Sequence, residues 1–166
     1  MDLVEVRDPW GTKHFWLNII CWGAGYQQVY NIKGEHKTPE NVWQTFVDTW
    51  VRIFGMPEMI VVDPGSEFLA YFTEMCAAYG GLVLPTDPRA PWQNGKTESA
   101  GKEWKIQFRL AQRKDAPLTL EEYFTLGKLC CSMRNRYNNR SGFSPMQRVF
   151  GFSTRLPTSL LSDDAI

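Results

Sequence analysis

Three carboxylates stand at positions in the sequence where they could act together. Asp2 opens a strand-like run, Asp63 follows the apolar run 59–62, and Glu98 lies in the first turn of an expected helix. Carboxylates at strand ends and at a helix start can converge on one point and hold two hard divalent cations, Mg²⁺ or Mn²⁺. Two such ions stabilise the attacking and leaving oxygens of a phosphoryl transfer. The pattern therefore indicates a metal-dependent enzyme that cuts or joins nucleic acid.

Each carboxylate also has an ordinary structural interpretation. Asp63 begins the sequence Asp-Pro-Gly-Ser, which is typical of turns. Glu98 would be favoured in a first helical turn by the helix dipole alone, and Asp2 could be a frayed terminal residue. Only the joint pattern of the three residues favours catalysis.

The helix expected from about residue 94 to 113 supports the catalytic interpretation. At about 100° per residue, its ionic side chains form a stripe roughly 80° wide, and Trp104 and Phe108 lie on the opposite side. The stripe consists of Glu98, Lys102, Lys105, Arg109 and Arg113. Four cations in line with a metal-binding carboxylate suit a DNA backbone that must reach the metal, whereas the alternative is a solvated basic face.

The segment before this helix is rich in Pro, Gly and Asn and is predicted to be a mobile loop over residues 85–95. Such a loop can close over a substrate. We expect Asn94 to lie near the scissile DNA end and Trp92 to stack on an unpaired base. The dipeptide Asn94-Gly95 is also ordinary turn sequence.

The remaining sequence predicts the elements that position these residues. Strands are expected at 2–6, 14–21, 26–32, 59–62 and 82–84, and helices at 39–54, 66–79, 94–113, 119–138 and 145–150. A strand–helix–strand crossover favours parallel pairing. The order therefore predicts an α/β fold in which a three-stranded antiparallel meander and two parallel strands form one mixed five-stranded sheet, with Asp2 and Asp63 on adjacent strands.

Composition limits the class of protein. The chain has 166 residues, 43% of them hydrophobic, which suits one globular domain with a proper core. No apolar run reaches the roughly 20 residues of a membrane span, and no signal peptide is visible. The four cysteines form no CxxC pair and are expected to be reduced thiols of an intracellular protein. The formal net charge of zero counts against a generally basic DNA-binding surface, so any such surface must be local.

Two blocks of sequence resemble a known family. The block Asp63-Pro-Gly-Ser-Glu-Phe68 and the block Pro91-Trp-Gln-Asn-Gly-Lys-Thr-Glu98, together with Asp2, resemble the catalytic core of retroviral and LTR-retrotransposon integrases, with the gypsy-like group most similar. The spacing of Asp63 and Glu98 is close to that of the family. The segment 144–157 also resembles the stretch that follows the core in such elements.

The resemblance implies an RNase H-like fold and two Mg²⁺ or Mn²⁺ ions held by Asp2, Asp63 and Glu98. It implies 3′-end processing and strand transfer, which insert element DNA into target DNA. Asn94, Lys102 and Lys105 match family positions that contact the element end. The expected partners are DNA and further copies of the chain, as a dimer or tetramer, and the expected location is the nucleus during integration.

The resemblance divides the chain into a catalytic core, 1–151, and a C-terminal extension, 152–166. No His/Cys zinc module and no clear basic C-terminal module accompany the core, so an excised core or a polyprotein fragment is expected. Two other functions stay open. One is a related RNase H-like transposase or nuclease, and the other is a non-catalytic integrase-derived module for DNA binding or oligomerisation.

Overall fold

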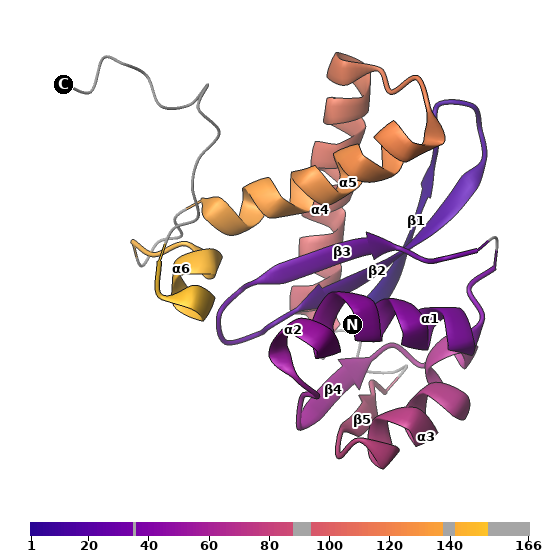
Figure 1. The fold of residues 1–166 in the computed structure, drawn as a ribbon, viewed down its shortest axis with the longest axis vertical. Helices are drawn as coiled ribbons and strands as arrows, with labels where there is room; N and C mark the ends of the chain where they lie inside the picture. The colour runs from indigo at the N-terminus through magenta and orange to yellow at the C-terminus, as the bar shows by residue number, and fades with distance from the viewer. Residues whose placement is uncertain (35, 88–93, 138–141, 153–166) are drawn as a thin grey trace.

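A computed structural model describes residues 1–34, 36–87, 94–137 and 142–152 of the chain. Over these residues, β-strands lie at the centre of the molecule and helices cover them on two sides (Figure 1). The predicted α/β class is therefore correct. No helix among the described residues is long and apolar enough to cross a membrane.

The first three strands form the predicted antiparallel meander. They are β1 (Asp2–Arg7), β2 (Lys13–Ile20) and β3 (Gln27–Asn31), with β2 in the middle. In this register Asp2 pairs with Asn18 and Val4 pairs with Trp16. Because directly paired residues project from the same face of a sheet, Asp2 and Asn18 share a face.

The other two strands, β4 (Met59–Val62) and β5 (Leu82–Pro85), pair in parallel as a separate ladder. The expectation of one continuous five-stranded sheet is not confirmed, since the described strands form a three-stranded and a two-stranded sheet. The sheets meet where the Met1 amino group donates a hydrogen bond to the Val61 carbonyl. β4 ends one residue later, so β1 and β4 overlap too briefly to form a ladder.

Two of the predicted helices are interrupted. The first is capped by Thr38 as expected but divides into α1 (Pro39–Phe46), a π-helical turn η1 (Val47–Val51) and α2 (Arg52–Phe54). The hydroxyl of Thr49 bonds the Thr45 carbonyl inside this stretch, a contact that favours local bending. The second divides into η2 (Ser66–Phe68) and α3 (Tyr71–Ala78), because Ala70 between them adopts a left-handed φ of 52°.

The C-terminal helices follow the prediction closely. They are α4 (Gly95–Asp115), α5 (Leu120–Arg136) and α6 (Pro145–Phe150). α5 begins with the predicted capping box of Thr119 and Glu122, and α6 begins with a second one at Ser144. The four cysteines are free, as expected.

Two apolar cores lie on opposite faces of the meander because strand residues alternate in direction. Leu17 and Ile19 of β2 pack with α1, α3 and β4. Trp16 packs on the other face against Trp104 and Phe108 of α4, and against α5. The second core fixes α4, the helix that carries Glu98, against the meander that carries Asp2.

Candidate active site

Asp2 and Asp63 come together where the two sheets meet. The hydrogen bond from Met1 to Val61 sets the start of β1 beside the end of β4. The carboxyl group of Asp2 is hydrogen-bonded to that of Asp63. The two acids therefore lie together, although β1 and β4 are not paired strands of one sheet as expected.

Because the carboxyl groups of Asp2 and Asp63 are in contact, the state in which both are ionised is unfavourable. Burial, the charge of Asp63 and the hydrogen bond between the two carboxyl groups raise the pKa of Asp2 from 3.8 to about 7, in that order of importance. The Leu3 backbone and the N-terminal ammonium oppose this rise in part. Burial also lowers the pKa of the Met1 amino group to about 6. Asp2 therefore keeps its proton to a much higher pH than an ordinary aspartic acid.

Asn94 supports Asp63 from the end of the loop. Its side chain is only 1% exposed, and its Nδ2 donates hydrogen bonds to Asp63 Oδ1 at 2.7 Å and to the Met1 carbonyl at 3.4 Å. Its Oδ1 is buried without a hydrogen-bond partner among the described residues. Asn94 thus orients Asp63, and the predicted contact of Asn94 with a DNA end stays a prediction.

Glu98 approaches the pair from α4. Asp2 and Glu98 line one hollow of about 370 Å³, together with Lys102 and Lys105. Glu98 Oε2 lies 3.8 Å from Lys102 Nζ, one helical turn away. Within the described residues, no three His, Cys, Asp or Glu side chains lie close enough to hold a metal ion together. The structure therefore joins Asp2 to Asp63 and sets Glu98 across a shared hollow.

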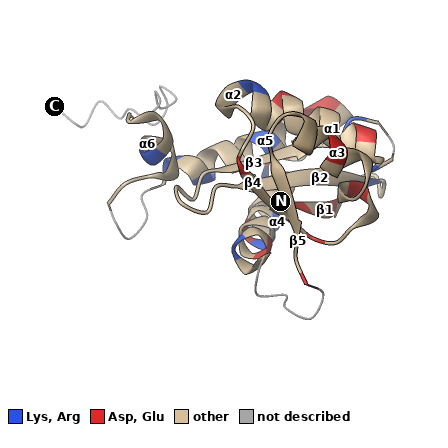
Figure 2. Cartoon of the chain, turned by 90° about the horizontal axis from the view of Figure 1, so that it is seen from below, with Lys and Arg blue, Asp and Glu red and all other residues tan. Residues whose placement is uncertain are grey.

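The basic stripe of α4 extends away from this hollow. Figure 2 shows Lys, Arg and acidic segments together on α4, beside the N-terminus of the chain. Lys102, Arg109 and Arg113 are exposed, Lys105 is half-buried, and Trp104 and Phe108 on the opposite side of the helix are buried. The predicted division of α4 into ionic and apolar sides is confirmed. Trp92 lies outside the described residues.

The chemistry of the donors suits a divalent cation, with Asp2 and Asp63 together and Glu98 apart from them. Two carboxylates are in contact here, and one of them has a strongly raised pKa. A bound dication would reduce the repulsion between their negative charges. The oxygens of Asp2, Asp63 and Glu98 are the hard ligands that Mg²⁺ and Mn²⁺ favour. The unpartnered Oδ1 of Asn94 adds a buried polar atom on the residue that bonds Asp63.

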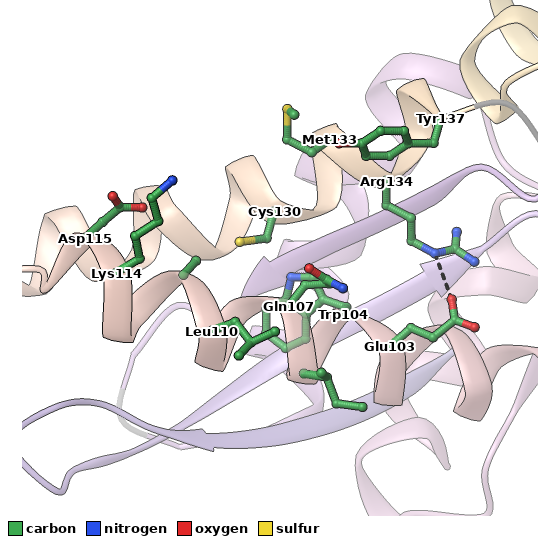
Figure 3. A pocket seen from close by; sticks show the side chains of 12 residues that line it. Glu103, Trp104, Gln107, Leu110, Lys114, Asp115, Cys130, Met133, Arg134 and Tyr137 are labelled. Atoms are coloured by element: carbon green, nitrogen blue, oxygen red, sulfur yellow. Dashed lines mark hydrogen bonds and ion pairs between the residues drawn. The ribbon is translucent and has the colours of Figure 1, made fainter.

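A larger hollow of about 780 Å³ lies elsewhere, between α4 and α5 (Figure 3). Trp104, Leu110 and Met133 contribute apolar side chains to it, and Arg134 reaches across to Glu103 at 3.4 Å. None of the three candidate carboxylates lines it. Phosphoryl transfer needs the carboxylates, so the smaller hollow is the candidate site.

The comparisons with known proteins concern the fold. Neither protein-family models nor curated proteins gave a match. The solved catalytic core domain of HTLV-2 integrase, in complex with magnesium and in trimeric form, matches with a TM-score of 0.72 at 19% identity over 88% of this chain and 90% of that one. The dimeric form gives 0.71 at 18% identity over the same shares, 88% and 90%. This chain has the integrase-core fold.

A third structure extends the comparison. The simian T-cell lymphotropic virus intasome, solved in complex with PP2A regulatory subunit B56 gamma, contains a chain that matches with a TM-score of 0.77 at 15% identity. The match covers 94% of this chain and 54% of that one, so this chain spans about half of the intasome chain. The integrase-core fold agrees with the expected RNase H-like class.

The sequence did not reveal every residue that builds the site. Asn18 and Gln27 are buried polar residues that connect β2 and β3 to α4, and neither was singled out. The available signal was an Asn between Leu17 and Ile19 in the middle of an apolar strand, where a polar side chain needs a hydrogen-bond partner.

Proposed function

We propose that this chain is the catalytic core of an integrase that performs two-metal phosphoryl transfer on DNA. The observation that carries the proposal is the Asp2–Asp63 pair in direct contact, at the meeting point of the two sheets in an integrase-core fold. Glu98 across the shared hollow and the cations beside it support the same function. The magnesium complex of the HTLV-2 core supports a divalent metal.

Asp2, Asp63 and Glu98 would hold two Mg²⁺ or Mn²⁺ ions, which when bound supply charge stabilisation for the attacking and leaving oxygens of a phosphodiester displacement. Asp2, whose pKa is raised, would have to lose its proton to serve as a ligand. Asn94 holds the Asp63 carboxylate in place through its 2.7 Å hydrogen bond. Lys102, 3.8 Å from Glu98, can turn to a phosphate when Glu98 serves as a ligand.

The substrate is DNA in this proposal. Lys102, Lys105, Arg109 and Arg113 would bind successive phosphates of an element end. Asn94 would contact the scissile end, and the same role is proposed for Trp92, which is outside the described residues. Water is the nucleophile in 3′-end processing, and the new 3′-hydroxyl is the nucleophile in strand transfer. Cations at this spacing support a backbone contact, which is independent of DNA sequence.

The test is a joining assay with labelled duplex oligonucleotides in Mn²⁺ or Mg²⁺. A second substrate is a branched DNA, whose reaction needs only one phosphoryl-transfer step. We expect the wild type to join DNA, and Asp63→Asn and Glu98→Gln to lose most of the activity. Glu103→Gln is the matched control, since it removes one negative charge from an exposed position on the same helix. A Glu98→Gln variant that joins DNA normally contradicts the assignment.

Two alternatives give different results in the same assays. Metal-dependent hydrolysis of an RNA–DNA hybrid without joining indicates a ribonuclease H-type nuclease. Binding of DNA without cleavage or joining under all metal conditions indicates a non-catalytic module.

Partners and location complete the proposal. The dimeric and trimeric forms of the HTLV-2 core support self-association of this chain. Sedimentation velocity over a range of protein concentrations measures it. An integrase acts where target DNA lies, so the proposed location is intracellular, in the nucleus during integration.

A further inference from the structure

A network of buried amide side chains connects the meander to the first turns of α4. Asn18 and Gln27 are fully buried, and Asn135 of α5 is 2% exposed. Asn18 Nδ2 donates to the Thr97 carbonyl at 2.9 Å, and Gln27 Nε2 donates to Asn18 Oδ1 at 2.8 Å and to the Ala100 carbonyl at 3.1 Å. The network therefore bonds backbone carbonyls of α4 on both sides of Glu98.

The same network begins at the strand position of Asp2. Asp2 and Asn18 are paired residues of β1 and β2 and share a face of the sheet. The backbone carbonyl that Asn18 holds belongs to Thr97, the residue before Glu98. A short path of fixed contacts thus connects Asp2, through its strand pair and one amide, to Glu98.

Gln27 is itself immobilised by α5. Its backbone N–H donates to Asn135 Oδ1 at 2.9 Å, and its carbonyl accepts a hydrogen bond from Asn135 Nδ2 at 2.6 Å. α4 also comes unusually close at Gly101, where an added Cβ would lie 2.9 Å from Asn18 Nδ2. This close approach needs a glycine and sets the distance between the helix and β2.

Stability alone does not account for these amides. Burying amide groups is costly, and Gln27 Oε1 lies buried without a hydrogen-bond partner among the described residues. Apolar side chains of similar shape would fill the same space at lower cost. Directional hydrogen bonds do what apolar packing cannot, which is to fix the rotation and height of α4 relative to β1.

We propose that Asn18 and Gln27 are positioning residues that set Glu98 relative to Asp2 for shared metal binding. The proposal rests on the proposed function of the carboxylates. It goes beyond that function because both side chains are fully buried and are not candidate ligands. Both act through the backbone of α4.

The test uses Asn18→Leu and the double variant Asn18→Leu/Gln27→Leu. The single variant removes one of the two acceptors of Gln27 Nε2 and leaves only the Ala100 carbonyl. The double variant replaces both amides with apolar groups and is expected to regain stability. If the two amides only stabilise the fold, the double variant should bind Mn²⁺ like the wild type. If they position α4, Mn²⁺ binding should stay weak in the double variant although its stability returns. The control is Thr45→Val, which removes a buried hydroxyl that bonds Asn41 in α1, away from α4.

Mn²⁺ affinity without DNA is the first measurement, with a melting curve for each variant. We expect both Asn18 variants to bind Mn²⁺ about 10–100-fold more weakly and the control to bind normally. A folded double variant with wild-type affinity overturns the proposal.

Amide hydrogen exchange in metal-free protein is the second measurement. In the double variant we expect faster exchange at residues 98–102 and unchanged exchange at 106–112. If the wild type binds no Mn²⁺, the proposed function fails. Hydrogen exchange then tests, independently of metal, whether the amide network positions α4. Unchanged exchange at 98–102 then overturns the positioning role.

Discussion

Replacing Asp63 with Asn should change how the stability of the metal-free protein depends on pH. The pKa of Asp2 is raised from 3.8 to about 7 in the folded chain. Between these values the folded state holds more protons than the unfolded state, so the free energy of unfolding falls as pH rises. The stabilising contribution is complete below pH 3.8 and is lost as the pH passes about 7.

The magnitude follows from the size of the shift. Each pKa unit corresponds to about 1.4 kcal/mol, so the pair can cost the folded state at most about 4 kcal/mol at pH 8. Asp2 is half-buried and water screens part of its charge, which makes about 2 kcal/mol a more realistic loss. In Asp63→Asn, Asp2 stays buried but the negative charge beside it is removed. We therefore expect the variant to lose less stability than the wild type between pH 5 and pH 8, by up to about 1 kcal/mol.

The assay is urea denaturation in a chelator at pH 5 and pH 8, for the wild type, Asp63→Asn and the exposed-carboxylate control Glu121→Gln. Asp8 and Asp48, whose pKa values are lowered in the folded chain, contribute with the opposite sign at lower pH. They are common to all three proteins and cancel in the comparison. Identical pH dependence in the wild type and Asp63→Asn would refute the coupling of the two carboxylates.

Three further predictions concern other parts of the molecule. Gly127→Ala should lower the free energy of unfolding by about 1–3 kcal/mol, because the new Cβ would lie 2.5 Å from Cη2 of the buried Trp16, and chemical denaturation measures the loss. Thr119→Ala should cost about 1 kcal/mol by removing the capping box of α5, whereas Thr119→Ser should keep most of it. Arg109→Ala and Arg113→Ala should each reduce the slope of log K against log salt for duplex DNA binding by about 0.9, and an unchanged slope would exclude that residue from the DNA contact.

Local signals were sufficient for most elements of the fold. Thr38-Pro39 and Thr119–Glu122 marked helix starts correctly because caps depend on neighbouring residues only. The break at Ala70 and the π-helical turn at 47–51 were missed, since tertiary packing imposes them on sequences with good helical spacing. One five-stranded sheet was expected because strand order predicts neighbours without predicting how far they overlap.

The proximity of Asp2 and Asp63 was predictable from the sequence, whereas the residues that support them were not. Asp2 and Asp63 could be brought together from strand order alone. The hydrogen bonds of Asn94 to Asp63 and of Asn18 to Thr97 join residues 31 and 79 positions apart, and no local pattern encodes such pairs. Their residue types were informative only in being polar where the chain is buried.

The central claim is that Asp2 and Asp63 form a divalent metal site, and Mn²⁺ titration calorimetry tests it most directly. The titration is run at pH 6.5 in two buffers of different ionisation enthalpy, with the wild type and Asp63→Asn, each with and without duplex DNA. We predict saturable binding to the wild type that releases protons from Asp2, and its loss in Asp63→Asn. Absence of saturable binding to the wild type with DNA present, or equal binding to Asp63→Asn, would contradict the claim.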